Sequence, residues 1–201
     1  LHDDVVDESD MRRGKATANA AFGNAASVLV GDFIYTRAFQ MMTSLGSLKV
    51  LEVMSEAVNV IAEGEVLQLM NVNDPDITEE NYMRVIYSKT ARLFEAAAQC
   101  SGILAGCTPE EEKGLQDYGR YLGTAFQLID DLNEGKPTLP LLHAMHHGTP
   151  EQAQMIRTAI EQGNGRHLLE PVLEAMNACG SLEWTRQRAE EEADKAIAAL
   201  Q

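Results

Sequence analysis

Apolar residues recur at helical intervals along nearly the whole chain, and the alternation typical of strands is missing. Long apolar helices separated by short breaks indicate an all-α protein, built as a large helical bundle. Gly46 and the Asn73-Asp74-Pro75 segment mark two of the breaks. The helices expected in the first half of the chain span about residues 3–9, 17–45, 47–72 and 78–104.

Local capping signals define several helix starts in the remaining sequence. Thr78 precedes Glu79 and Glu80, which are acidic residues favoured in a first turn. The segments TPEE at 108–111 and TPEQ at 149–152 are capping boxes with proline at the first helical position. We therefore expect helices to begin at these places, with a last one from about Ser181.

Composition narrows the class of protein. The 201 residues fit one domain spanning 1–201, and a formal charge of −15 argues against a nucleic-acid partner. No apolar run reaches the roughly 18 residues that a membrane span needs. Cys100, Cys107 and Cys179 form no CxxC pair and are interpreted as reduced core thiols of a cytoplasmic protein.

Three aspartates at the start of the chain form the pattern D-D-x-x-D. Asp3 and Asp7 share one helix face, and Asp4 lies beside Asp7 at a spacing of three residues. Oxygen ligands of this kind suit Mg²⁺, which takes one or two carboxylates plus substrate phosphates. A solvated acidic helix end is the alternative interpretation of such a cluster.

Basic residues follow this cluster closely. Arg12 and Arg13 are adjacent, and paired arginines suit the oxygens of a diphosphate held through a metal ion. A plain salt-bridged surface remains the alternative. Farther along, Asp130 and Asp131 end an apolar helix, and Lys89 offers an ammonium group to phosphate, although an exposed helix lysine would explain Lys89 alone.

Together these segments resemble the all-trans polyprenyl diphosphate synthases. The resemblance rests on motifs that occur in the family's order across most of the chain. They are LHDDVVDESDMRRG at 1–14, GD at 31–32, YSKTA at 87–91, GTAFQLIDD at 123–131 and EGKPTLPLL at 134–142.

The resemblance implies a Mg²⁺-dependent enzyme with a helical fold of the isoprenoid synthase type and a central cleft. Such an enzyme condenses farnesyl diphosphate with successive isopentenyl diphosphates, and the implied product is octaprenyl diphosphate for the ubiquinone side chain. A homodimer is also implied.

The resemblance further assigns roles to individual residues. The catalytic set is Asp3, Asp7, Lys89 and Asp130. The metal set is Asp3, Asp4, Asp7, Asp130 and Asp131. The diphosphate set is Arg12, Arg13, Lys89, Thr90 and Gln127.

Three segments of the family pattern are missing. We expect absent helices before Leu1, absent sequence after Gln201, and an absent loop near residues 130–132, where two family blocks abut. The junction predicts a break in the structure within Ile129–Asn133, and Glu134 falls at the third carboxylate position of the second motif.

The growing hydrocarbon needs an apolar tunnel, and the expected helix over 17–45 could line it. From Thr17 to Met42 such a helix measures about 38 Å, close to the length of eight isoprene units. Met41, Met42 and Met54 are candidate floor residues that set the chain length, although ordinary core methionine is the alternative for each.

Two other functions compete with chain elongation. A class I terpene cyclase shares the helical fold and the first aspartate motif, but it steers carbocations with aromatic faces, and aromatic residues are only 5% here. A non-catalytic subunit of a heteromeric synthase tends to lose its acidic ligands, whereas this chain keeps Asp3, Asp4 and Asp7.

Overall fold

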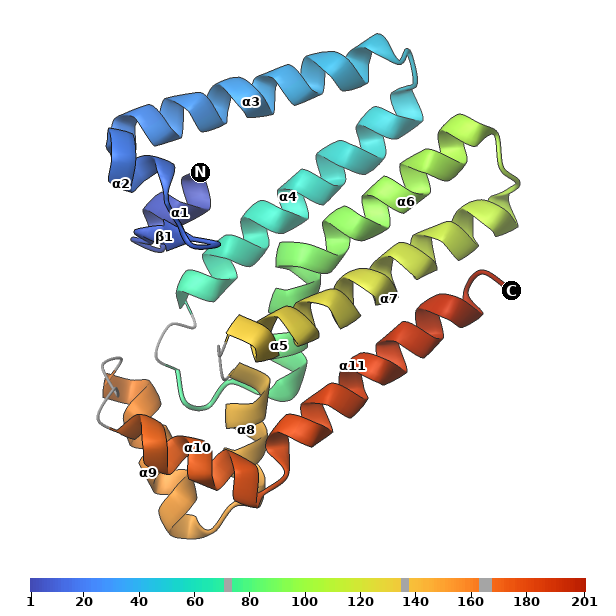
Figure 1. Cartoon of the computed structure of the whole chain (residues 1–201). Coiled ribbons are helices and arrows are strands. Elements are labelled where there is room, and N and C mark those ends of the chain that lie inside the picture. Colours follow the sequence, from blue (N-terminus) through green and yellow to red (C-terminus); the bar gives the residue numbers. More distant parts are fainter. Residues whose placement is uncertain (71–73, 135–137, 163–167) are drawn as a thin grey trace. The chain divides into compact units, whose positions relative to one another are not determined.

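The structure is a computed structural model that describes residues 1–70, 74–134, 138–162 and 168–201, without the side chains at 131–134, 138, 162 and 169. This part of the chain is almost entirely helical, as the sequence predicts (Figure 1). It forms two compact units, Leu1–Leu51 and Glu52–Gln201, and the boundary falls inside helix α4 (Leu48–Met70). The expectation of a single domain stays a prediction.

The first unit combines three complete helices with one small hairpin and the start of α4. Its elements are α1 (His2–Val6), β1 (Met11–Arg12), β2 (Lys15–Ala16), α2 (Ala18–Phe22) and α3 (Asn24–Ser44). Helix α1 packs on both α2 and α3. It ends earlier than predicted, because Asp7 is its C-cap and Glu8 adopts a φ of 51° that a helix cannot continue.

The all-α fold class is confirmed, and the structure adds one small hairpin that the sequence did not predict. Strands β1 and β2 pair antiparallel, with Arg12 opposite Lys15. The two residues between them, Arg13 and Gly14, have φ values of 51° and 76°. Positive φ at both central positions is the mark of a type I′ turn, whose twist matches that of the flanking strands.

The helix expected over 17–45 is two helices, so this prediction is wrong in part. Thr17 is the N-cap of α2, and its hydroxyl accepts a hydrogen bond from the amide of Ala20 at 3.4 Å. Gly23 then interrupts the helix with φ 86° and ψ 158°, and α3 begins at Asn24. A conformation of this kind is open to glycine and costly for other residues.

The second unit contains the remaining helices. After α4 they are α5 (Glu79–Ile86), the π-helical turn η1 (Tyr87–Ala91), α6 (Arg92–Ala105), α7 (Pro109–Glu134), α8 (Thr138–His147), α9 (Pro150–Gln162), α10 (Leu169–Ala178) and α11 (Ser181–Ala198). Among the described residues, no helix combines the length and hydropathy that crossing a bilayer requires.

The predicted capping signals are confirmed. Thr78 is the N-cap of α5 and accepts a hydrogen bond from Asn81 N at 3.2 Å. Thr108 and Glu111 exchange hydrogen bonds of 2.8 and 3.3 Å at the start of α7. The same reciprocal pattern joins residues 149 and 152 at 2.9 and 3.3 Å.

Helix α7 organises the second unit. It packs against α6 and against α11, which run beside it (Figure 1). Glycines make both contacts close: an added Cβ on Gly119 would lie 2.5 Å from the carbonyl oxygen of Phe94, and one on Gly114 would lie 2.8 Å from that of Ala199. Small residues therefore set how near these helices lie.

Two apolar clusters complete the core of this unit. One joins α5, α7, α8 and α11 and contains the fully buried Leu128 together with Tyr82, Ile86 and Leu139. Trp184 packs against it and stacks on His143 with ring centroids 4.4 Å apart. The other cluster joins α8, α9 and α10 and is centred on Ala144, Ile156 and Met176.

Two further expectations are corrected by the structure. The break predicted within Ile129–Asn133 is wrong, because α7 continues without interruption from Pro109 to Glu134. The interpretation of all three cysteines as core thiols is also wrong in part. All three are free, but only Cys100 is buried.

Gly123 tests the importance of close helix packing. An added Cβ there would lie 2.7 Å from the Cα atom of Ala91. We expect Gly123→Ala to lower the free energy of unfolding by about 1–3 kcal/mol, measured by urea denaturation. Helix propensity alone predicts the opposite, a gain of about 1 kcal/mol. A stabilised variant would therefore contradict the packing argument, and Ser101→Ala on the exposed part of α6 is the control.

Candidate functional site

The acidic helix α1 presents its carboxylates at three levels of exposure. Asp4 is buried with 4% exposure, Asp3 is half-buried and Asp7 is exposed. The Asp7 amide donates to the carbonyl of Asp3 at 2.8 Å, which continues the helical spacing and keeps both side chains on one face. This confirms the predicted geometry of Asp3 and Asp7.

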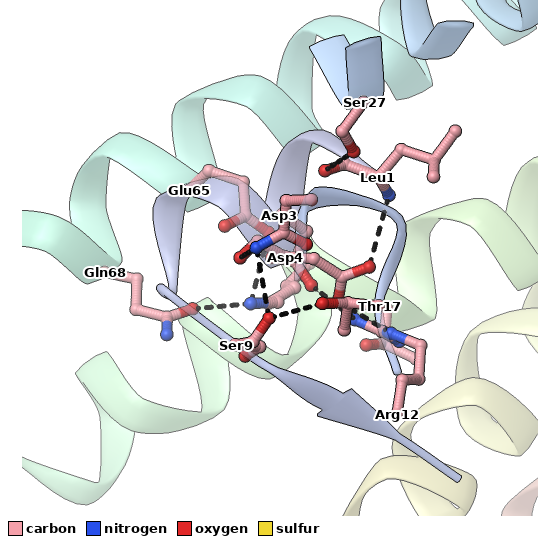
Figure 2. Close-up of polar contacts among 12 residues, drawn as sticks. Leu1, Asp3, Asp4, Ser9, Arg12, Thr17, Ser27, Glu65 and Gln68 are labelled. Carbon is pink, nitrogen blue, oxygen red and sulfur yellow. Dashed lines mark hydrogen bonds and ion pairs between the residues drawn. The ribbon is translucent and has the colours of Figure 1, made fainter. Parts of the chain in front are cut away.

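Arg12 reaches from the hairpin to this helix (Figure 2). Its Nε donates to Asp4 Oδ1 at 2.8 Å, and its Nη2 donates to Asp3 Oδ2 at 3.0 Å. The hydrogen bond to Asp4 is the main cause that raises the pKa of Arg12. In this structure Arg12 therefore orients the carboxylates, and its role as a diphosphate ligand stays a prediction.

The segment after α1 is tied down by its neighbours (Figure 2). The carbonyl of Ser9 accepts from Thr17 Oγ1 at 2.7 Å and from the Asn19 amide at 3.1 Å. Thr17 is itself buried. These bonds hold the backbone between α1 and α2, so the acidic residues lie on an anchored helix despite its short length.

His2 is a residue of this site that the sequence analysis missed. Its Nε2 lies 3.0 Å from the carbonyl of Val28 and 3.1 Å from Asp32 Oδ1, both on α3. An added Cβ on Gly31 would lie 2.7 Å from the His2 ring, so only glycine leaves room for it. Helix α1 therefore packs on α3 at the Gly31-Asp32 motif. The histidine within the motif at residues 1–14 was the signal that could have identified this contact.

Arg13 occupies a different place from its neighbour. It lies in the turn of the hairpin with a φ of 51° and is exposed. Its predicted contact with a second diphosphate is not tested by this position. Positive φ is uncommon for arginine, and such residues often mark functional sites.

Lys89 lies on the π turn η1 of the second unit. Its ammonium donates to Gln68 Oε1 at 3.1 Å and lies 3.4 Å from Glu65 Oε1, with both partners on α4 (Figure 2). The side chain is 28% exposed, so the interpretation as an exposed helix lysine is wrong. Glu65 and Gln68 were missed by the sequence analysis. Gly64 beside them was the available signal, since glycine inside a helix often marks close packing.

Thr90 and Gln127, two of the predicted diphosphate ligands, contact each other. Thr90 Oγ1 donates to Gln127 Oε1 at 2.7 Å, which joins η1 to α7. Both side chains are half-buried. Adjacent residues of one turn, Lys89 and Thr90, therefore contact two different helices, and three predicted site residues lie within this unit around η1.

Asp130 lies near the end of α7 and is half-buried. It lines a largely apolar groove between α7 and α11 with Phe126, Ile129, Ala189 and Ala193. The side chain of Asp131 lies outside the described residues, as does that of Glu134. The meeting of Asp3, Asp7 and Asp130 around one metal stays a prediction, since these residues belong to different units.

The carboxylate oxygens of helix α1 are chemically suited to bind Mg²⁺. In the described part of the chain, no three His, Cys, Asp or Glu side chains converge into a complete metal site. Mg²⁺ does not require one, because it keeps waters and takes only one or two carboxylates plus substrate phosphates. The accessible carboxylates of Asp3 and Asp7 match that demand.

The predicted floor residues lie on two helices. Met41 is 62% exposed and Met42 half-buried, both near the end of α3, while Met54 is half-buried on α4. Met41 and Met42 belong to the first unit and Met54 to the second. Their joint role as a floor therefore stays a prediction.

Comparison with known proteins shows which proteins this chain is similar to. The octaprenyl diphosphate synthase of Escherichia coli K12 is 92% identical over 219 residues, covering 100% of this chain and 68% of the relative. The aligned 219 positions exceed the 201 residues of the chain by 18, so the relative has that many positions without a counterpart here. The chain spans about two thirds of the relative's length.

Solved structures of prenyl synthases are also similar to this chain. A decaprenyl diphosphate synthase from Rhodobacter capsulatus matches with a TM-score of 0.94 and 40% identity, covering 98% of this chain and 67% of that one. A polyprenyl synthase from Caulobacter crescentus, complexed with calcium and isoprenyl diphosphate, matches with a TM-score of 0.91 and 41% identity over 99% of this chain and 66% of that one. The polyprenyl synthetase family model matches residues 1–176. The chain therefore belongs to the polyprenyl synthetase family.

Proposed function

We propose that this protein is a Mg²⁺-dependent prenyltransferase that condenses farnesyl diphosphate with successive isopentenyl diphosphates. The product is a long-chain all-trans polyprenyl diphosphate, octaprenyl diphosphate for the ubiquinone side chain. The observation that carries this proposal is the 92% identity to an octaprenyl diphosphate synthase across the whole chain. We place the activity in the cytoplasm.

The proposed reaction is an ionisation followed by an alkylation. The carbon–oxygen bond of the allylic diphosphate breaks, and the diphosphate leaves with the bonding electrons. The double bond of isopentenyl diphosphate then attacks the allylic cation, and transfer of a proton to the departed diphosphate restores a double bond in the lengthened chain. Magnesium, when bound, neutralises the charge that grows on the departing diphosphate.

The residues of the chain hold and orient the reacting groups. Asp3 and Asp7 supply carboxylate oxygens for the metal, with Asp4, Asp130 and Asp131 as the other proposed ligands. Lys89 and Thr90 donate charge-assisted and neutral hydrogen bonds to the allylic diphosphate. Glu65 and Gln68 orient the Lys89 ammonium, and Gln127 orients the Thr90 hydroxyl. Arg12 and Arg13 are the proposed ligands of the two diphosphates.

Removal of one metal ligand tests the activity directly. We expect Asp3→Ala to abolish incorporation of radiolabelled isopentenyl diphosphate in the presence of Mg²⁺ and farnesyl diphosphate, because the metal loses a carboxylate of its binding face. Helicity measured by circular dichroism should stay unchanged. Asp10→Ala, an exposed aspartate outside the D-D-x-x-D pattern, is the control. Normal turnover in the Asp3 variant would contradict the metal role and favour the alternative interpretation, in which the cluster is a solvated acidic helix end.

An internal segment is also proposed to be absent near residues 130–132. The 18 surplus aligned positions support this, because two family motifs abut at that place in the sequence. The length is that of a functional loop rather than of a short connection. Inserting a segment of this length between Asp130 and Leu132 would separate the two abutting motifs, as in the family pattern.

A homodimer is proposed from the surface of α3. Its apolar side chains are unusually exposed within one chain: Leu29 is 67%, Phe33 68% and Ile34 54% exposed. Leu29 and Phe33 lie four residues apart and so share one helix face. Grouped exposed apolar side chains mark interaction sites, and in a symmetric dimer the same face of both copies becomes buried. The proposed partner is thus an identical chain.

Sedimentation tests this assembly. The protein is expected to sediment as a dimer at micromolar concentration, and Phe33→Glu should shift it toward the monomer, since a charge on a buried apolar face is unfavourable. Lys49→Glu, a charge change outside α3, is the control. A monomer at that concentration before any substitution would contradict the proposal.

The helix that could line the tunnel is shorter than the sequence predicts. Because Gly23 ends α2, the helix that could line the tunnel runs only from Asn24, and its length to Met42 is about 27 Å. Eight isoprene units at about 4–5 Å each are longer than this. Met41, Met42 and Met54 stay the proposed floor, but α3 alone does not measure the product.

Methionine truncation separates a tunnel floor from ordinary packing. If one of these side chains stops the growing product, its replacement by alanine should give longer products, with the first condensations hardly affected. Core packing alone predicts unchanged products and a loss of stability, about 2–5 kcal/mol for a fully buried methionine. Chromatography of the products from Met41→Ala, Met42→Ala and Met54→Ala decides between them. Unaltered length in all three variants places the floor elsewhere.

A further inference from the structure

The turn that carries Lys89 and Thr90 is not an ordinary part of its helix. Residues Tyr87–Ala91 form the π turn η1 directly between α5 and α6, and the amide of Arg92 donates to the carbonyl of Tyr87 across five residues. A π turn adds one residue to a helical turn and is rare, and it occurs frequently at functional sites. The surrounding contacts hold this π turn in place.

Neighbouring glycines make room for the wider turn. An added Cβ on Gly64 of α4 would lie 2.5 Å from Ser88 Cβ. One on Gly123 of α7 would lie 2.7 Å from Ala91 Cα. Ser88 and Ala91 are both buried, with 8% and 0% exposure. The turn is therefore enclosed by two helices whose surfaces are shaped to it.

A buried hydrogen-bond network spans the turn. The Tyr87 hydroxyl donates to Glu95 Oε2 at 2.7 Å, and Gln116 Nε2 donates to Glu95 Oε1 at 2.6 Å. Arg92 Nη1 lies 3.7 Å from Glu95 Oε2. Glu95 and Arg92 are each 5% exposed, so the carboxylate depends on these partners for stabilisation.

The bond between Tyr87 and Glu95 depends on the π turn. In a regular α-helix, residues eight apart differ in direction by about 80°, because each residue turns the chain by about 100°. The extra residue of the π turn relates Tyr87 and Glu95 as residues seven apart, which differ by only about 20°. Only the π register thus brings the hydroxyl and the carboxylate to the same face.

The Tyr87 hydroxyl keeps its proton in this network. Burial is the main cause that raises the pKa of Tyr87 to about 12, and the hydrogen bond to Glu95 adds to it. The group is therefore a hydrogen-bond donor at any pH near neutrality. A hydroxyl that always donates can hold the turn in one conformation.

We infer that Tyr87 is a positioning residue for the proposed diphosphate ligands, and that its hydrogen bond to Glu95 fixes the π register that directs Lys89 toward Gln68 and Thr90 toward Gln127. The inference rests on the proposed function, since it gives Tyr87 a purpose through two ligands of the substrate. Tyr87 itself contacts no reacting atom in this scheme. Its loss weakens substrate binding by freeing the turn.

The variant Tyr87→Phe tests this role, with Tyr118→Phe on α7 as a matched control. Tyr118 is half-buried, and no hydrogen bond of its hydroxyl is found among the described residues. We expect Tyr87→Phe to lower kcat/KM for farnesyl diphosphate about tenfold, the scale of a lost hydrogen bond to a charged group. Unchanged kcat/KM in an active enzyme would overturn the inference and leave the proposed function intact.

A second substitution separates positioning from a general loss of structure. In a Lys89→Gln background, where one positioned ligand is already gone, the effect of Tyr87→Phe should shrink well below tenfold, as coupled residues require. An equal loss in both backgrounds overturns the inference, because a merely structural role acts independently of Lys89. Incorporation of radiolabelled isopentenyl diphosphate is sensitive enough for the weakened variant.

One readout is independent of activity. Amide hydrogen exchange at Arg92, whose N–H closes the π turn, should become faster in Tyr87→Phe than in the unsubstituted protein. Exchange that stays the same overturns the inference whether or not the protein is active. Absence of incorporation by the unsubstituted protein is a different result, because it argues against the proposed function while the exchange experiment still decides the role of Tyr87.

Discussion

The close approach of α4 and α7 to the π turn is the constraint on which the second unit depends. Gly64 and Gly123 lack the side-chain atoms that would collide with Ser88 and Ala91, so the backbones meet nearly directly. That distance in turn lets Lys89 reach Gln68 and Thr90 reach Gln127. A larger residue at either glycine would separate the helices and pull these pairs apart. Packing and site geometry therefore share one cause.

Close packing against a glycine also occurs in the first unit. Gly31 leaves a space on α3 that the His2 ring fills, and the ring contacts the Val28 carbonyl and the Asp32 carboxylate. Helix α1 is too short to be stable by itself. His2, its first residue, anchors the helix on α3, and Arg12 holds its carboxylates from the hairpin. In both units, glycine leaves the space into which a segment with proposed site residues packs.

The sequence alone predicted those features whose causes are local. Thr78 was identified as a cap by the acidic first turn that follows it, and Thr108 and Thr149 by a partner three residues later. The helical class and the D-D-x-x-D geometry followed from spacing in the same way. Family motifs also marked Lys89, Thr90 and Gln127, although their contacts could not be derived from them.

Features with distant causes were missed. The π turn depends on glycines of two other helices, so nothing within YSKTA distinguishes it from a regular helix. The hairpin has strands of two residues each, too short for any alternation to appear. The break at Gly23 had a signal in the glycine itself, but the apolar residues around it continued the helical pattern. Lys89 was taken as exposed when considered alone, since Glu65 and Gln68 lie more than 20 residues earlier.

The most direct test of the account is a crystal structure of the protein with Mg²⁺ and a non-hydrolysable thio-analogue of farnesyl diphosphate. The account predicts diphosphate oxygens within hydrogen-bond distance of Lys89 Nζ and Thr90 Oγ1, with the π turn at Tyr87–Ala91 kept and the metal on Asp3 and Asp7. A regular α-helix through residues 87–91, or a diphosphate bound away from Lys89 and Thr90, would contradict it.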